Sequence, residues 1–155
     1  MRTNNRMNPL RRLMHCNSGQ SLVETALAVS LCGTLMLGAA EFGRLAYAGI
    51  EISDAARSGV EYGSQSHAMA QDNANMQIAA SSSAPDVTNL TTTGSHFCKC
   101  ADGTSSTCLT TDCSGSRIIE YVQVNTSANV NPLIYVPGLP KSYSISGTAV
   151  MRVVQ

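Results

Sequence analysis

The chain has 155 residues and carries ten basic and ten acidic side chains, so its formal net charge at pH 7 is zero. This length is sufficient for one membrane anchor and one small domain. The sequence has no Trp, no basic patch and no aromatic stacking motif, so nothing in it predicts nucleic-acid binding.

The first segment of the chain is basic. Residues 1–19 hold four arginines and no acid, whereas the rest of the chain carries six Lys and Arg against all ten acids. An uncharged stretch, Thr25–Ala40, follows closely. Counted from Gln20, the segment has 21 residues, which as a helix measure about 31 Å, the thickness of a hydrocarbon core. We therefore predict a basic leader at 1–19 and a membrane-spanning part of a helix at 20–41.

The charge asymmetry also predicts an orientation. Because the positive charges of the leader all precede the apolar stretch, the positive-inside rule places the N-terminus in the cytoplasm and residues 42–155 across the membrane. A cleavable secretory signal has a similar basic end and apolar run. The run from Leu35 to Ala40 resembles the cleavage site of such a signal, so a secreted protein with a cleaved signal stays open as an alternative.

A helical pattern continues beyond the apolar stretch. Small and apolar residues recur at helical spacing on one side, with charged residues opposite. The apolar side comprises Phe42, Leu45, Ala46, Gly49, Ile52, Ala56, Val60 and Gly63, and the charged side Glu41, Arg44, Glu51, Asp54, Arg57 and Glu61. We expect one continuous helix from about Gln20 to about Gly63, whose second half packs on a core.

A second helix and three strands are predicted for the rest of the chain. We predict a second helix at His67–Ser82, which ends before Pro85 because proline cannot extend a helix. Beyond Pro85 the apolar side chains alternate, which predicts strands at Val87–Phe97, Ile118–Val124 and Tyr143–Val153. Three strands packed across the amphipathic half of the long helix form a two-layer α+β domain.

Four cysteines, Cys98, Cys100, Cys108 and Cys113, lie in one polar loop, 98–113. An even cluster in a small Ser/Thr-rich domain predicts disulfides formed in an oxidising compartment. A direct Cys98–Cys100 bond would be strained, and we expect Cys100–Cys108 nested inside Cys98–Cys113. A zinc site is the rival interpretation, although structural zinc sites usually show longer steps between ligands. The bridges either stiffen the loop or hold it as an exposed recognition tip.

No arrangement of residues in the sequence is typical of catalysis. His15, His67 and His96 have no acid or serine near them in a recognisable pattern, and no pair of carboxylates indicates hydrolysis. Cys32, in the apolar stretch, is interpreted as a small membrane hydrophobe. We therefore expect no enzymatic activity, no metal and no cofactor.

Three stretches of the chain share a known pattern. They are Gly19-Gln-Ser-Leu-Val-Glu24-Thr-Ala-Leu-Ala, Asp54-Ala-Ala-Arg57-Ser-Gly59-Val-Glu-Tyr62-Gly and Ser146-Gly-Thr-Ala-Val-Met151-Arg152-Val153. Together they resemble the TadE-like family of minor pilins from the tight-adherence (Flp, type IVb) pilus systems of bacteria. The resemblance implies a pilin-like fold, with a long N-terminal helix on a small antiparallel sheet and a second short helix. The middle of the chain, including the cysteine loop, is unmatched.

The resemblance also implies processing by a prepilin peptidase. The scissile bond would be Gly19–Gln20, and Glu24 would be the fifth residue of the mature chain. A small residue before the cut gives a membrane-embedded enzyme access to the backbone. Glu24 would then pair with the new N-terminus of Gln20 in a neighbouring subunit. Pilins of this system often carry Tyr where this chain has Thr25, which argues against the major pilin.

The implied function is that of a minor pilin or pseudopilin in pilus assembly and surface adhesion. The chain would cross the bacterial inner membrane once, hold 42–155 in the periplasm and be available for the extracellular pilus. Its partners would be the prepilin peptidase, other pilin and pseudopilin subunits, the inner-membrane assembly platform and membrane lipid. The alternative is a signal-anchored periplasmic binding module, stabilised by disulfides and unrelated to pilus assembly.

Overall fold

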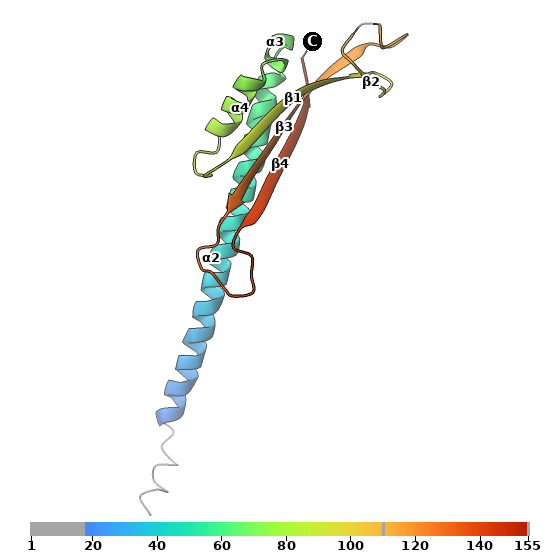
Figure 1. Cartoon of the computed structure of the whole chain (residues 1–155). Coiled ribbons are helices and arrows are strands. Elements are labelled where there is room, and N and C mark those ends of the chain that lie inside the picture. The colour runs from blue at the N-terminus through green and yellow to red at the C-terminus, as the bar shows by residue number, and fades with distance from the viewer. Residues whose placement is uncertain (1–17, 110, 155) are drawn as a thin grey trace, which may run out of the picture. The chain divides into compact units, whose positions relative to one another are not determined.

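The structure, a computed structural model, describes residues 18–109 and 111–154 (Figure 1). Its elements are α2 (Ser18–Gly63), α3 (His67–Ala70), α4 (Asn73–Ser82), β1 (Thr91–Cys100), β2 (Ser105–Ser106), β3 (Ile118–Val130) and β4 (Tyr143–Arg152). The strands form one antiparallel sheet in the order β2-β1-β3-β4. The predicted α+β class, with a long N-terminal helix packed on a small antiparallel sheet, is confirmed.

The chain divides into two compact units, Met1–Ala40 and Glu41–Gln155. In the first unit, every residue from Gly19 to Ala40 lies in α2 and is exposed. The three hydroxyl side chains of the uncharged stretch each donate to a carbonyl three or four residues earlier, at 2.8–2.9 Å. The uncharged stretch therefore satisfies its hydroxyl groups within the helix and exposes apolar side chains, as a helix in lipid must.

In the second unit, α2 and α4 pack on one face of the sheet. β3 buries every second residue along its central part, Val122, Val124, Thr126 and Ala128. This period of two is typical of a strand with one face against the core. The main hydrophobic cluster comprises Val60, Ala70, Met76, Ala80, Val122, Val124 and Val153.

Two glycines bring α2 close to its neighbours. A Cβ atom on Gly147 of β4 would lie 2.9 Å from the carbonyl oxygen of Ile52 and from Oγ1 of Thr126. A Cβ atom on Gly59 would lie 3.0 Å from the carbonyl oxygen of Met76. The buried Thr126 hydroxyl donates to the Ile52 carbonyl at 2.7 Å, so a satisfied polar contact joins α2 to β3.

The predicted second helix, His67–Ser82, is divided in two. The Asp72 side chain accepts a hydrogen bond from the Asn75 N–H at 3.0 Å and thereby caps α4 as a separate helix. β3 is longer than predicted and ends at Val130, because Thr126 and Ala128 continue the buried alternation.

The first strand begins later than the predicted Val87. The Val87 N–H donates to the Ala84 carbonyl in a turn at 3.3 Å, and Asn89 has a φ of 58°. A residue in this left-handed conformation cannot continue a strand. β1 therefore begins at Thr91 and extends to Cys100, where the unpredicted β2 pairs with it.

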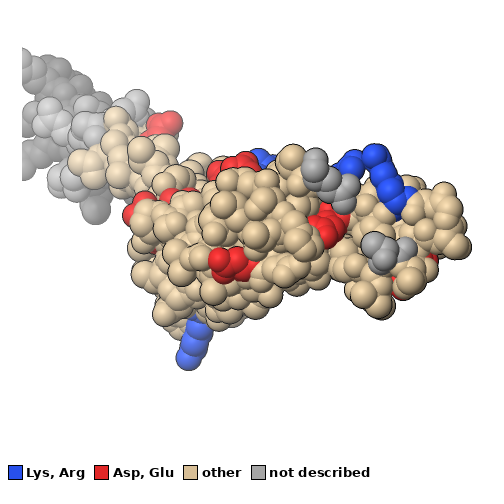
Figure 2. All heavy atoms as spheres, turned by 90° about the horizontal axis from the view of Figure 1, so that it is seen from above, with Lys and Arg blue, Asp and Glu red and all other residues tan. Residues whose placement is uncertain are grey.

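Charged side chains are sparse on the surface. Lys, Arg, Asp and Glu together make up 13% of the chain, and Figure 2 shows them scattered among uncharged residues on the face that it draws.

Candidate functional site

The predicted processing and assembly residues, Gly19, Gln20 and Glu24, are exposed at the start of α2. Most of the predicted leader lies outside the described residues, which begin at Ser18. Apart from its chain neighbours and the backbone of α2 itself, a Cβ atom on Gly19 would have no described heavy atom within 4 Å. Within residues 18–109 and 111–154, no ion pair or side-chain hydrogen bond involves Glu24. The described part of the chain thus offers this carboxylate no partner.

Apolar side chains surround Glu24. Leu22, Val23 and Leu27 are 73%, 59% and 67% exposed. An acid at the centre of a membrane helix costs roughly 2.5–3.5 kcal/mol on insertion scales, so acids in such helices usually pair with another group. If the helix enters lipid, pairing with a cation from outside the described chain would reduce this cost.

Two disulfides join the predicted cysteines, in a pattern different from the nested one. Cys98 bonds to Cys108 with a Cα–Cα distance of 5.2 Å, and Cys100 bonds to Cys113 with 5.5 Å. Both distances are in the usual range for disulfides. The sulfurs are bonded to each other, so they offer no thiolates to the zinc ion considered as the rival.

The register of β1 and β2 explains this pairing. Cys98 lies opposite Ser106, so the chain that returns through β2 brings Cys108 beside Cys98. Cys100 lies at the end of β1 and opposite Ile118, so the segment that leads into β3 brings Cys113 beside it. The nested prediction was wrong because β2 is too short for its pattern to appear in the sequence.

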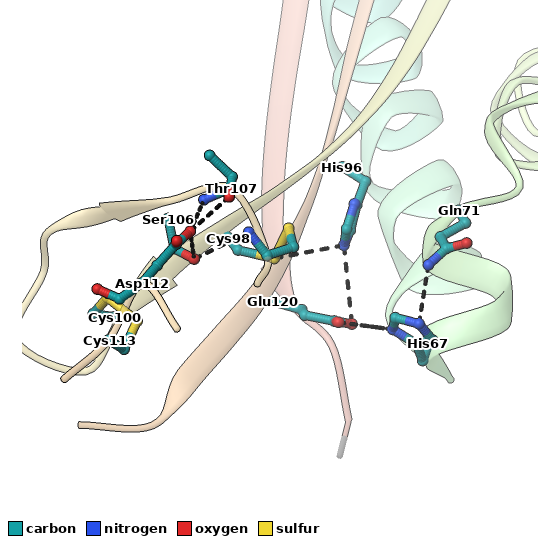
Figure 3. The surroundings of a disulfide bond; sticks show 11 residues. His67, Gln71, His96, Cys98, Cys100, Ser106, Thr107, Asp112, Cys113 and Glu120 are labelled. Carbon is teal, nitrogen blue, oxygen red and sulfur yellow. Dashed lines mark hydrogen bonds and ion pairs between the residues drawn. A yellow bond between two sulfur atoms is a disulfide. The ribbon is translucent and has the colours of Figure 1, made fainter. Parts of the chain in front are cut away.

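Hydrogen bonds to Asp112 order the loop between the two bridges (Figure 3). The Thr107 hydroxyl and backbone N–H each donate to Asp112 at 2.6 Å, and the Ser106 hydroxyl donates at 3.1 Å. The Thr107 hydroxyl, followed by its N–H, holds the pKa of Asp112 below its ordinary value. The bridged end is therefore held by hydrogen bonds as well as by disulfides.

Two histidines flank one carboxylate beside the Cys98–Cys108 bridge. The sequence analysis did not predict this cluster. His67 Nδ1 lies 2.7 Å from Glu120 Oε1, and His96 Nε2 lies 3.9 Å from Glu120 Oε2 (Figure 3). Cys98 is paired with Glu120 across β1 and β3, which makes His96 the diagonal neighbour of Glu120. The strand register is the signal that would have revealed the cluster.

Comparison with known proteins bears on α2. Residues 19–61 match the TadE-like protein family. The match begins at Gly19, includes Glu24 and covers less than half of the chain, and it confirms the resemblance predicted from the sequence. No curated protein and no solved structure matches the chain.

The TadE-like match covers two of the three stretches singled out in the sequence, apart from the last two residues of the second. The third stretch, Ser146–Val153, lies beyond the match and includes most of β4. Gly147, within it, is the residue that accommodates Ile52 of α2. The third stretch therefore has a packing role that connects it to the matched helix.

Proposed function

We propose that this chain is a minor pilin or pseudopilin that acts in assembly of a tight-adherence pilus and in surface adhesion. The observation that carries the proposal is the TadE-like match over 19–61, whose first part is an exposed apolar helix. Residues 20–41 would cross the inner membrane, and 42–155 would form a periplasmic domain. Other pilin and pseudopilin subunits, the assembly platform and lipid would contact the chain.

Membrane anchoring is supported by the composition of α2. Among the described residues, α2 is the helix that is long and apolar enough to cross a membrane. Its uncharged stretch holds its hydroxyls in bonds to its own backbone, which removes a cost of burial in lipid. We infer that the N-terminal helix is a membrane anchor.

Cleavage between Gly19 and Gln20 by a prepilin peptidase would supply a cation for Glu24, which has no ion pair with any described residue. The new α-amino group has an ordinary pKa of about 7.7–8.0 and is mostly protonated at pH 7. Glu24 lies four residues further along, roughly one helical turn or ~6 Å of rise. The amine of one copy and the carboxylate of the next would remove two isolated charges from lipid by pairing, and would set the stagger between copies.

The mass of the natively expressed chain tests this proposal directly. We expect a species that begins at Gln20 in cells with the peptidase, and the precursor alone in cells without it. Gly19→Val should block cleavage. Because a Cβ atom at residue 19 would lie in open space beside the helix, the block would report on the peptidase and not on misfolding. Gly33→Val, in equally open space on the same helix, is the matched control and should be cleaved normally.

The other outcomes would identify the alternatives. An intact N-terminus at Met1 in the presence of the peptidase would contradict processing and favour the signal-anchored binding module. A mature N-terminus after about Ala40 would favour a secreted protein with a conventional signal.

A further inference from the structure

The loop between β3 and β4 exposes a group of large apolar side chains. Its members are Leu133, Ile134, Tyr135, Val136 and Leu139, each 47–69% exposed. Residues 131–142, here named the apolar loop, contain no acid and one basic residue, Lys141. An apolar group of this kind usually marks a contact with a protein partner or a membrane.

Side chains of α2 hold the apolar loop in place. The Leu133 N–H donates to Glu41 Oε2 at 3.1 Å. The Arg44 guanidinium donates to the Asn131 carbonyl and also pairs with Glu41, Nη2 to Oε1, at 3.1 Å. Both α2 residues are partly buried, so this is a packed attachment.

The attachment point lies next to the predicted membrane span. Glu41 directly follows Ala40, the last residue of the uncharged stretch, and is the first charge after it. If Thr25–Ala40 lies in hydrocarbon, then Glu41 and Arg44 lie at the level of the lipid headgroups on the far side. A loop bonded to both is held at that level.

We propose that the apolar loop inserts into the headgroup region of the bilayer, beside the point where α2 leaves the membrane. The inference rests on the proposed membrane anchor, which sets the level of the bilayer. The occupant of this surface is a lipid bilayer. The loop would then be a second membrane contact, which limits rotation of the second unit about its anchor.

The polar residues of the loop fit this environment. The Lys141 ammonium lies 5.8 Å from the centre of the Tyr135 ring. Tyrosine and lysine are residues that bury an apolar body while the polar tip stays among headgroups. With one cation and no acid, the loop also suits a surface that contains anionic lipid.

Part of the loop backbone presents no free N–H donor to the membrane. Pro132, Pro137 and Pro140 have no N–H. The Leu139 N–H donates to the Val136 carbonyl at 3.1 Å in a turn whose third residue, Gly138, has a φ of 97°. Proline second and glycine third is the pattern of a type II turn, so the sequence itself closes the loop tip.

A tryptophan reporter tests the proposal, because the natural chain contains no Trp. Ile134→Trp places the reporter in the loop, and Ile78→Trp, a similarly exposed position on α4, is the matched control. Each full-length chain would be reconstituted into phosphatidylcholine and phosphatidylglycerol vesicles, with and without brominated acyl chains. We expect Ile134→Trp to show blue-shifted emission that brominated lipid quenches, and Ile78→Trp to show neither effect.

Three results would overturn the proposal. If both variants are quenched equally weakly while the chain still floats with the vesicles, the loop does not contact lipid and only the anchor is supported. If the chain does not float with the vesicles, the proposed membrane anchor is contradicted as well. A blue shift without lipid quenching, which grows with the density of protein in the vesicles, would instead assign the loop to a second copy of the chain.

Discussion

At the scale of single residues, Glu24 is the group that the proposed function depends on most. It is a carboxylate among exposed apolar side chains, and the described part of the chain gives it no ion pair. A structural acid would normally have a partner in its own fold. Its place in the TadE-like match supports the proposed role between subunits.

Replacement of this acid should separate processing from assembly. Glu24→Gln keeps the shape of the side chain and removes its charge, so we expect normal cleavage after Gly19 and a strong fall in sheared surface pili. Glu61→Gln, on the exposed side of the same helix, is the control and should leave pilus output unchanged. Normal piliation with Glu24→Gln would contradict the charge-pairing role.

Gly147 has no side chain, which allows α2 to pack closely against β4 at this position. A Cβ atom at this position would lie 2.9 Å from the Ile52 carbonyl, whose place is fixed by the Thr126 hydroxyl. We expect Gly147→Ala to lower the free energy of unfolding by about 1–3 kcal/mol, as overpacking of a core does. Thermal unfolding in detergent micelles measures the loss. Gly43→Ala, in open space on α2, should cause no loss, and equal effects of both variants would contradict the packing argument.

Asp112 is expected to make the bridged loop sensitive to acid. Hydrogen bonds from Thr107 lower the pKa of Asp112 from its ordinary value of 3.8. A group whose pKa is lowered on folding contributes stability above the unfolded pKa and loses it as pH falls through the folded pKa. The protection factor of the Thr107 amide, which corrects its exchange rate for the intrinsic effect of pH, should therefore fall below pH 3.8.

Removal of the strongest donor provides the control for this titration. Thr107→Val deletes the hydroxyl, so the pKa of Asp112, followed by NMR of its carboxyl carbon, should rise back toward 3.8. The same pKa in the variant and the natural chain would show that the hydroxyl does not determine it.

At the scale of elements, the bridged end of the sheet makes a sharp covalent prediction. Under denaturing, non-reducing conditions, trypsin cuts after Lys99 and a protease specific for the N-terminal side of Asp cuts before Asp102 and Asp112. Each cysteine then lies in a separate peptide. We expect the peptide 86–99 linked to 102–111 and the peptide 100–101 linked to 112–117. A link between 86–99 and 112–117 would restore the nested pairing.

In the second unit, the two disulfides and the apolar loop lie at opposite ends of the sheet. The bridges attach to Cys98 and Cys100 at the end of β1, whereas the apolar loop joins the end of β3 to the start of β4. Because β1 and β3 are antiparallel, the end of β1 lies opposite the start of β3. The sheet thus separates the proposed lipid contact from the bridged end.

At the scale of the whole molecule, the number of free thiols tests the proposed membrane topology. A chain that begins at Gln20 has five cysteines, of which Cys32 is free and the others form bridges. Disulfides persist in oxidising compartments and are rare in the cytosol. We expect one maleimide label per denatured, unreduced chain and five after reduction. Two labels before reduction would indicate retention of Cys16, and five would place the second unit in the cytoplasm.

Local sequence patterns alone determined the main elements and predicted the match to the TadE-like family. The helical period and the uncharged stretch predicted α2, and alternation predicted the core of β3 and β4. The motif from Gly19 to Glu24 predicted the TadE-like match. These features are legible in sequence because each depends on neighbours within one or two turns of helix or one strand. The roles of Gly19, Gln20 and Glu24 remain predictions.

Only the tertiary structure decided which distant residues meet. The sequence did not indicate that Glu120 lies between His67 and His96, which the packing of α3, β1 and β3 brings together. Nor did it pair the cysteines correctly or connect Glu41 to Leu133, 92 positions away. A shift of one residue in strand register moves every side chain to the other face of the sheet, and hydrophobic pattern and turn geometry set that register over the whole fold. Contacts across strands therefore follow from the assembled sheet, whereas the elements follow from their own residues.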